Sequence, residues 1–346
     1  MRLLITGGAG FVGSTLGIFL KTQRPRFKIK AFDNLKRRGS EQNLPRLKSY
    51  GIEFLHGDVR SLSDLQSAGS FDLLLDCAAE PSVLAGHYDS PAYLINTNLL
   101  GTFNSLEVAR LHKAAFILLS TSRVYSIAAI SSLQYDETET RFSLSKKNKV
   151  LGLTLQGIDE TFSTQGVRSF YGSSKLASEM FLQEYQHWYG LKGLVNRCGV
   201  LTGPWQMGKV DQGFVALWLM SHLLNQPLQY IGFHGLGKQV RDILHVDDLA
   251  RLILYQIENL NKLSGSLFNV GGGLANIVSL QELTVLCQKY SGKKIKITPN
   301  PKPRPMDIPW YVTNNAHVTK TCEWTPKKNV EQILEDILNW VIHHDR

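Results

Sequence analysis

The start of the chain is the feature that most constrains its fold. Residues 2–6 form a short apolar run, and a helical pattern extends from the turn after it to about Lys21. The turn has the sequence Gly7-Gly8-Ala9-Gly10-Phe11-Val12-Gly13. Glycines at this spacing let the backbone turn tightly and approach a pyrophosphate, whose charge meets the N-terminus of the helix. Because a strand, a glycine turn and a helix follow one another, the sequence predicts a dinucleotide-binding unit.

The second expected strand, Ile29–Phe32, ends in Asp33, at roughly the distance from the last glycine that such units require. An acid there accepts hydrogen bonds from the ribose 2′-hydroxyl and repels a 2′-phosphate, which favours NAD over NADP. Lys36, Arg37 and Arg38 follow at once and weaken this preference. These cations form either a solvated loop or a cover over the adenosine end of the cofactor.

Two further strands, 52–55 and 72–76, lead to small or acidic residues. After the first, Asp58 could meet an adenine amino group, or it could cap the helix that begins near Leu62. The second runs into Ala78 and Ala79, whose small side chains let the backbone pass close to a flat ligand.

A helix is expected from about Pro91 to Lys113, and it carries Asn98, a residue type that usually serves packing or the surface. The strand after it, Phe116–Leu119, opens into a hydroxyl-bearing run that includes Thr121. A hydroxyl at the carboxyl end of a parallel strand lies where open α/β sheets bind ligands, although it can also simply cap a turn. The alternation of strands and helices predicts an α/β fold with a doubly wound parallel sheet.

Tyr171 and Lys175 lie four residues apart in an expected helix that runs to about Tyr189. At this spacing the two side chains share one helix face. The lysine ammonium can lower the pKa of the phenol and hold it where it exchanges a proton with a sugar hydroxyl. Taken alone, this pair is weak evidence, because the same spacing occurs by chance in many helices.

The rest of the chain is less regular. Residues 126–169 show no clear period, and a loop of that length is usually functional or mobile. We expect an NAD-binding Rossmann domain over 1–195, joined by some later segments, and a smaller α/β substrate lobe over 196–346. Within this lobe, helices are expected near 213–224, 246–260, 278–291 and 328–344. A proline-rich stretch that contains Arg304 is expected to be a stiff loop.

Composition excludes several classes of protein. No apolar run reaches the ~18 residues of a membrane span, and the chain starts without a signal-peptide pattern, so we expect a cytoplasmic protein with no membrane partner. The formal net charge is +9, but the basic residues form no stripe with interleaved aromatics, so no nucleic-acid partner is expected. The four cysteines show no metal spacing, and they are expected to be reduced thiols, with no metal site.

The glycine turn, Asp33, Thr121 and the Tyr171/Lys175 pair together resemble the extended short-chain dehydrogenase/reductase family of NAD-dependent sugar-nucleotide epimerases and dehydratases. A stretch in the second lobe, Arg241-Asp242-Ile243-Leu244-His245-Val246-Asp247-Asp248, also matches this family. The resemblance covers essentially the whole chain. It implies the cofactor NAD, a nucleotide-diphosphate sugar as substrate, and a homodimer formed by a four-helix contact that uses the helix bearing Asn98 and the helix bearing Tyr171.

The resemblance also implies a role for particular residues. The catalytic residues would be Thr121, Tyr171 and Lys175. Substrate contacts would come from Thr121, Arg241 and, less securely, Arg304. Cofactor contacts would come from Gly7, Gly10, Phe11, Val12, Gly13, Asp33, Asn34, Asp58, Val59, Ala78, Ala79, Asn98, Tyr171 and Lys175. The chain departs from the family at Ser126, where a glycine is usual, and in Asp76-Cys77-Ala78-Ala79-Glu80, where His-x-Ala-Ala-Gln is usual.

Three stretches resemble the CDP-paratose 2-epimerase (CDP-tyvelose epimerase) branch: 33–35 with 38–40, 135–141 and 307–315. Family dehydratases carry Asp-Glu directly after the threonine, whereas this chain has Ser122 and Arg123, which cannot act as a carboxylic acid and base. A simple epimerisation, by hydride removal to NAD and return to the opposite face, is therefore favoured, and the resemblance to this branch implies that the inverted carbon is C2. The alternatives are a 4-epimerase of a UDP-, dTDP- or GDP-sugar, a net dehydrogenase or reductase, and an inactive dinucleotide-sensing protein.

Overall fold

The computed structural model describes residues 1–208 and 212–344, and these form two compact units. Unit 1 comprises residues 1–124, 170–197 and 249–268, and unit 2 comprises residues 125–169, 198–248 and 269–346. The sequence predicts a Rossmann domain over 1–195 that some later segments join. Residues 125–169 fall into unit 2, and residues 249–268 are the later segment that returns to unit 1.

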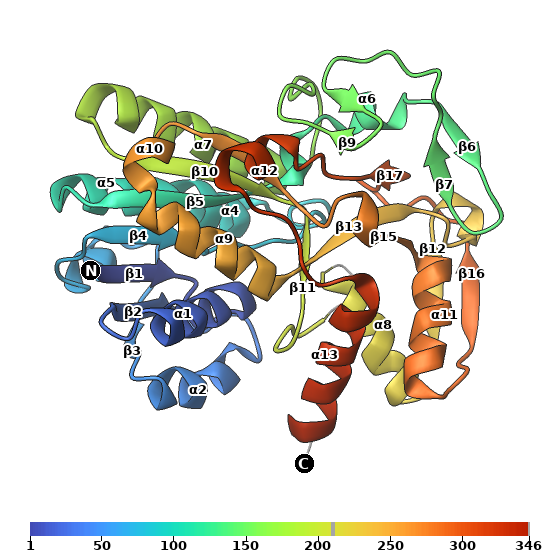
Figure 1. The fold of residues 1–346 in the computed structure, drawn as a ribbon, viewed down its shortest axis with the longest axis horizontal. Coiled ribbons are helices and arrows are strands. Elements are labelled where there is room, and N and C mark those ends of the chain that lie inside the picture. Colours follow the sequence, from blue (N-terminus) through green and yellow to red (C-terminus); the bar gives the residue numbers. More distant parts are fainter. Residues whose placement is uncertain (209–211, 345–346) are drawn as a thin grey trace. The chain divides into compact units, whose positions relative to one another are not determined.

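Unit 1 is organised by a seven-stranded sheet with the order β14-β10-β5-β4-β1-β2-β3 (Figure 1). The pairs β1–β2, β2–β3, β1–β4 and β4–β5 are all parallel. The strands are β1 (Arg2–Thr6), β2 (Lys28–Asp33), β3 (Glu53–His56), β4 (Leu73–Asp76), β5 (Ala115–Thr121), β10 (Gly193–Cys198) and β14 (Leu267–Val270). Strand order reverses between β1 and β4, which makes this the doubly wound sheet that the sequence predicts.

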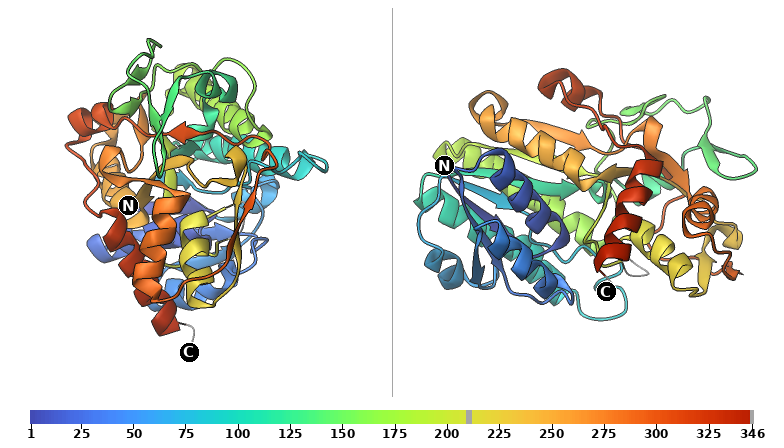
Figure 2. Two further views of the ribbon diagram at one scale, coloured as in Figure 1. Left: turned by 90° about the vertical axis from the view of Figure 1, so that its right-hand side faces the viewer. Right: turned by 60° about the horizontal axis from the view of Figure 1, so that its bottom comes forward.

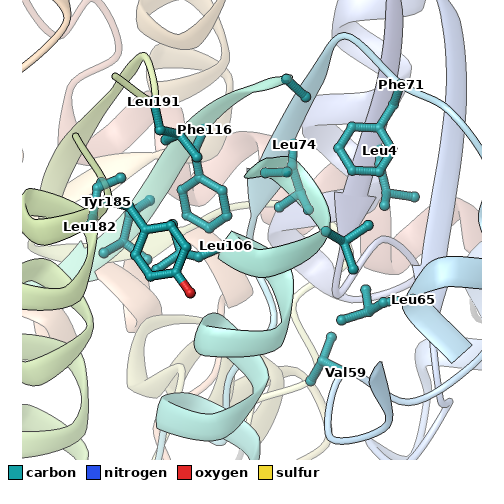
Figure 3. Close-up of a cluster of buried hydrophobic side chains, with 14 of the residues drawn as sticks. Leu4, Val59, Leu65, Phe71, Leu74, Leu106, Phe116, Leu182, Tyr185 and Leu191 are labelled. Atoms are coloured by element: carbon teal, nitrogen blue, oxygen red, sulfur yellow. The ribbon is translucent and has the colours of Figure 1, made fainter. Parts of the chain in front are cut away.

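Helices cover both faces of this sheet, because neighbouring strand residues point to opposite sides. The helices of this part of the chain are α1 (Phe11–Gln23), α2 (Asn43–Ser49), α3 (Leu62–Ser67), α4 (Ala92–Ile95), α5 (Gly101–Leu111), α7 (Phe170–Tyr189), α9 (Val246–Glu258) and α10 (Leu260–Leu263). Gly17 of α1 lies against Ile5 of β1. On the other face, Leu4 of the same strand joins a cluster with Leu106 of α5 and Leu182 of α7 (Figure 3).

The helix expected over 91–113 is present but not regular. It consists of α4, a π-helical turn over Asn96–Leu100 and α5. Single π turns occur often at functional positions, because they rotate the side chains after them relative to a regular α-helix. Asn98 lies in this turn and is fully buried.

Unit 2 contains a second, smaller sheet with the order β11-β13-β15, to which β17 adds through β13. The remaining strands form three pairs, β12–β16, β6–β7 and β8–β9. The strands are β6 (Tyr135–Glu137), β7 (Phe142–Leu144), β8 (Leu153–Thr154), β9 (Gly157–Ile158), β11 (Val200–Thr202), β12 (Leu228–Ile231), β13 (Val240–His245), β15 (Ile277–Ser279), β16 (Ile297–Asn300) and β17 (Trp310–Tyr311). The stretch 126–169, which shows no period in the sequence, thus contains two short hairpins.

The helices of unit 2 are α6 (Ile127–Ser131), α8 (Phe214–Leu223), α11 (Leu280–Ser291), α12 (Ala316–Cys322) and α13 (Val330–His344). Figure 2 shows α8, α11 and α13 side by side, and their contacts enclose a second apolar core. These helices confirm the ones expected near 213–224, 278–291 and 328–344. Within residues 1–208 and 212–344, no helix has both the length and the apolar character needed to cross a membrane.

Candidate active site

The glycine turn joins β1 to α1 in a conformation that other residues would disturb. Gly7 has a φ of +62°, and a Cβ there would lie 2.8 Å from the carbonyl oxygen of Cys77. A Cβ on Gly13 would lie only 2.3 Å from the carbonyl oxygen of Gly7. Gly10 is extended and precedes the first helical residue, so the backbone N–H groups of Phe11 and Val12 lie in the first turn of α1, where a helix supplies no acceptor of its own. The turn is therefore a cradle for an anionic group.

Asp33 lies at the end of β2, as expected, and both its oxygens accept hydrogen bonds from the backbone. Oδ2 accepts from the N–H of Ala9 at 3.1 Å, and Oδ1 accepts from the N–H of Leu35 at 2.8 Å. Burial raises the pKa of the Asp33 carboxyl, and the backbone donors oppose that rise. Asp33 thus connects the glycine turn to the loop after β2. This structural role is additional to its predicted contact with the ribose.

Asp58 is the centre of a polar cluster. Arg60 pairs with both Asp58 oxygens, at 3.0 and 2.6 Å, and Asn34 donates to Oδ2 at 2.9 Å. Mainly through the hydrogen bonds from Arg60, the pKa of Asp58 falls to about 2. The alternative that Asp58 caps the next helix is wrong, because Ser61 is the N-cap of α3 and accepts from the N–H of Asp64.

Aromatic and cationic groups surround this cluster. The guanidinium of Arg60 lies over the ring of Tyr93, 5.0 Å from its centroid, and the Lys36 ammonium lies 5.8 Å from the same centroid. Asp58 and Arg60 line a pocket together with Ser61, Asn96 and Leu100. Val59, also a predicted cofactor residue, is buried in the core cluster, and its carbonyl accepts from Asn104 at 2.9 Å.

The segment after β4, which departs from the family pattern, is held by buried polar contacts. Asp76 accepts hydrogen bonds from Thr6 at 2.6 Å and from Thr102 at 2.8 Å, so its carboxylate joins β1, β4 and α5. Beyond Ala78 and Ala79, the N–H of Glu80 donates to Asn98 Oδ1 at 2.7 Å. Asn98 in turn donates to the carbonyl of Glu80 and to Ser174 Oγ, at 3.1 and 3.2 Å.

Tyr171 and Lys175 lie in the first turns of α7, and this helix contacts β5 and the short helix Ser122–Val124 that follows Thr121. Thr121 is buried, and its Oγ1 accepts a hydrogen bond from the N–H of Arg123 at 3.2 Å. The threonine therefore caps a turn, which is one of the two roles expected for it, the other being contact with a ligand. This bond leaves Thr121 Oγ1 its own proton to donate.

Lys175 is the buried cation of this site. Its side chain is 1% exposed, and its Nζ has no hydrogen-bond partner among the described residues. A buried ammonium without partners is costly unless a ligand or a neighbouring charge compensates it. The glycine cradle and this ammonium both fit NAD, whose pyrophosphate and ribose hydroxyls are the acceptors that such groups bind.

Residues that the sequence did not single out form a buried polar cluster with α7. Ser120 Oγ donates to Glu179 Oε1, and Arg197 donates to the other oxygen, Oε2, at 2.7 Å from Nη2. The side chains of Arg197 and Glu179 are 7% and 2% exposed. The one signal for Glu179 in the sequence is its spacing, four residues after Lys175.

The predicted substrate residues Arg241 and Arg304 both belong to unit 2. Arg241 lies in β13 and is paired with Asp307, whose Oδ1 accepts from Nη2 at 2.7 Å. Burial lowers the pKa of Arg241, Asp307 opposes this, and the positive charge of Arg304 adds to it. Two cations and one carboxylate thus lie close together here.

The chain belongs to the NAD dependent epimerase/dehydratase family, whose model matches residues 3–271. It is therefore an enzyme of the nucleotide-sugar epimerases and dehydratases, and its cofactor is NAD. The predicted fold and family are confirmed.

Among particular relatives, CDP-paratose 2-epimerase of Salmonella typhi is 33% identical over 351 residues, which cover 98% of this chain and 99% of that one. dTDP-glucose 4,6-dehydratase of Salmonella typhimurium is 27% identical over a match that covers 99% of this chain and 93% of that one. The structure is also similar to UDP-glucose 4-epimerase of Thermus thermophilus in complex with NAD. The TM-score is 0.79 at 25% identity, and the match covers 99% and 100% of the two chains.

Proposed function

We propose that this protein epimerises a nucleotide-diphosphate sugar, most specifically CDP-paratose to CDP-tyvelose by inversion at C2. The observation that carries the proposal is full-length similarity to CDP-paratose 2-epimerase at 33% identity. The residues after Thr121 support it independently. Ser122 and Arg123 offer no carboxylic acid and base, which loss of water from the sugar requires.

The proposed chemistry needs only a few side chains. Tyr171, as phenolate beside the Lys175 ammonium, takes the proton from a sugar hydroxyl. Thr121 Oγ donates a hydrogen bond to the oxygen that becomes a carbonyl. Bound NAD supplies the hydride acceptor and donor. Arg241 and Arg304 bind the diphosphate, and Asp307 keeps Arg241 paired when no diphosphate is present.

The test is incubation of the enzyme with CDP-, UDP-, GDP- and dTDP-sugars in ordinary and in deuterated water, with product stereochemistry determined by NMR. We expect turnover of CDP-paratose, inversion at C2 and retention of the original hydrogen. Solvent deuterium at the inverted carbon would indicate proton abstraction next to a carbonyl and would contradict the proposal.

The alternatives predict different results in the same experiment. A 4-epimerase would invert C4 of a UDP-, dTDP- or GDP-sugar and leave CDP-paratose unchanged. A net dehydrogenase would accumulate NADH in proportion to the sugar consumed, whereas an epimerase keeps a steady NAD absorbance. A binding protein without chemistry would turn over none of these sugars.

We also propose that two copies of the chain associate through α5 and α7. Large apolar side chains project from these helices into solvent: Phe103, Leu111, Met180, Phe181, Trp188 and Tyr189. The rings of Phe103 and Phe181 contact each other across the two helices, with centroids 6.2 Å apart. The exposed apolar surface around Phe103 and Phe181, on two packed helices, fits the same surface of a second copy.

A further inference from the structure

The buried ion pair between Glu179 and Arg197 lies on the helix that carries the proposed catalytic pair. Tyr171, Lys175 and Glu179 follow one another at four-residue spacing, so they lie on one face of α7. Each step is about 6 Å along the helix axis. A buried carboxylate is therefore one turn away from a buried ammonium.

In a simpler arrangement, Lys175 and Glu179 would pair with each other, because residues four apart on a helix are natural ion-pair partners. The structure has a different pairing. The Glu179 carboxylate is bound by Arg197 Nε at 3.1 Å, by Arg197 Nη2 at 2.7 Å and by Ser120 Oγ. The Lys175 ammonium has no hydrogen-bond partner among the residues described.

We propose that Arg197 is a positioning residue that binds the Glu179 carboxylate and thereby keeps the Lys175 ammonium available to Tyr171. The proposal rests on the roles proposed above for Tyr171 and Lys175. Buried ion pairs seldom add net stability over apolar residues of equal volume, so a pair placed here is better explained by what it does to its neighbours. Ser120 of β5 also binds the Glu179 carboxylate, so the ion pair is connected to the strand that carries Thr121.

Other charged groups on the elements around α7 already have partners. Asp76 of β4 accepts from two threonines, and Glu107 of α5 pairs with Arg110. The remaining titratable groups on and beside these elements are Glu80 and Cys77 after β4, Arg123 and Tyr125 after β5, Tyr93 of α4, Cys198 of β10, Arg168 before α7, and Glu184, Tyr185, His187 and Tyr189 farther along α7. Glu80 Oε1 accepts from the N–H of Ser82, and Tyr185 donates to Glu107.

The proposal predicts shifts of opposite sign from the two halves of the ion pair. In Arg197→Met, Glu179 is released to pair with Lys175, so the Tyr171 phenolate loses support and its ionisation midpoint rises. In Glu179→Gln, the Arg197 charge is no longer compensated, so the phenolate gains support and the midpoint falls. For charges about 12 Å apart at a protein's effective dielectric constant, each shift is on the order of one pH unit or somewhat less.

The measurement is a spectroscopic titration of tyrosinate in the NAD-loaded protein. Because the chain has 12 tyrosines, each variant is measured beside the same variant carrying Tyr171→Phe, and the difference isolates Tyr171. No sugar substrate is needed. A failure of the proposed epimerase reaction would therefore leave this result intact, and the converse also holds.

Further variants protect the test against misfolding. Arg197→Lys keeps a cation and is expected to hold the wild-type midpoint. The double variant Glu179→Gln with Arg197→Met removes both charges and is expected to return the midpoint to the wild-type value. If the two single variants shift the midpoint in the same direction, or leave it unmoved while folding normally, the proposal is wrong.

A matched control lies next to the ion pair. Asn196 precedes Arg197 in β10 and exchanges two hydrogen bonds of 2.8 Å with Gln256 of α9. The side chains of Asn196 and Arg197 point to opposite faces of the sheet. Asn196→Ala breaks a buried polar pair of similar depth without changing charge, so thermal stability is expected to fall while the Tyr171 midpoint stays unchanged.

Discussion

At the scale of single residues, the sharpest test of the site is Tyr171→Phe. The change removes the phenol oxygen, which in the proposed mechanism accepts a proton from the sugar and returns it. General acid–base groups contribute about 10²–10⁴-fold to rate. We expect kcat to fall by this factor while NAD still binds, since the glycine cradle and Lys175 are untouched. Fluorescence titration with NAD, set beside steady-state kinetics, separates the two effects. Full turnover by this variant would contradict the catalytic assignment.

The Asp58–Arg60 pair leads to a prediction about acid stability. The pKa of Asp58 in the folded protein is about 2, below its usual value of 3.8. Its contribution to stability is therefore present above pH ~4 and lost as pH falls through ~2. Because the Arg60 side chain is 39% exposed, solvent screening limits this contribution to about 1 kcal/mol.

Urea unfolding of the wild type and of Asp58→Asn tests this at neutral pH and near pH 2.5. The variant is expected to be about 1 kcal/mol less stable at neutral pH, and the difference is expected to shrink to less than half of this near the lower value. A difference that persists unchanged at the lower pH would show that Asp58 acts through packing or hydrogen bonding rather than through its charge.

Sequence reasoning placed residues correctly where their relative position depends on neighbours along the chain. Tyr171 and Lys175 could be paired because four-residue spacing on a helix fixes their shared face. Arg197 could not be found in this way. It reaches Glu179 only because β10 lies next to β5 in the sheet and beneath α7. Asp307 was missed as a partner of Arg241 for the same reason, since 66 residues separate them.

At the scale of elements, the turn between β1 and α1 allows a graded prediction. A Cβ on Gly13 would lie 2.3 Å from the Gly7 carbonyl oxygen, whereas one on Gly10 would lie 3.1 Å from the same atom. Gly13→Ala must displace the turn, at a cost of about 1–3 kcal/mol, and Gly10→Ala needs only a small adjustment. Urea unfolding is expected to rank Gly13→Ala below Gly10→Ala in stability. The reverse order would mean that the turn relaxes freely.

The regular elements were predictable because a single pattern extends across each of them. Strands such as β1 and β4 are short apolar runs, and α11 and α13 have clear helical periods. The hairpins within 126–169 have strands of only two or three residues, too short to establish an alternation. The π turn in the helix carrying Asn98 was also missed, because it results from packing and leaves no signature in residue type.

At the scale of the whole molecule, the question is what covers the apolar face of α5 and α7. Phe181 is 40% exposed and Trp188 is 71% exposed, and exposed apolar side chains that gather on a surface mark an interaction site. If two copies pair through this face, Phe181→Asp places a charge in the contact and separates them. We therefore expect the wild type to sediment as a dimer at micromolar concentration and Phe181→Asp to sediment as a monomer.

Leu155→Asp is the control for this experiment. Leu155 is 76% exposed, and it lies between β8 and β9, away from both helices in the sequence and in a different unit. A charge there is expected to leave the dimer intact. Because association stabilises the folded chain by mass action, the melting temperature of the wild type should rise with protein concentration, whereas that of Phe181→Asp should not. A wild type that sediments as a monomer, with a melting temperature independent of concentration, would refute pairing through α5 and α7.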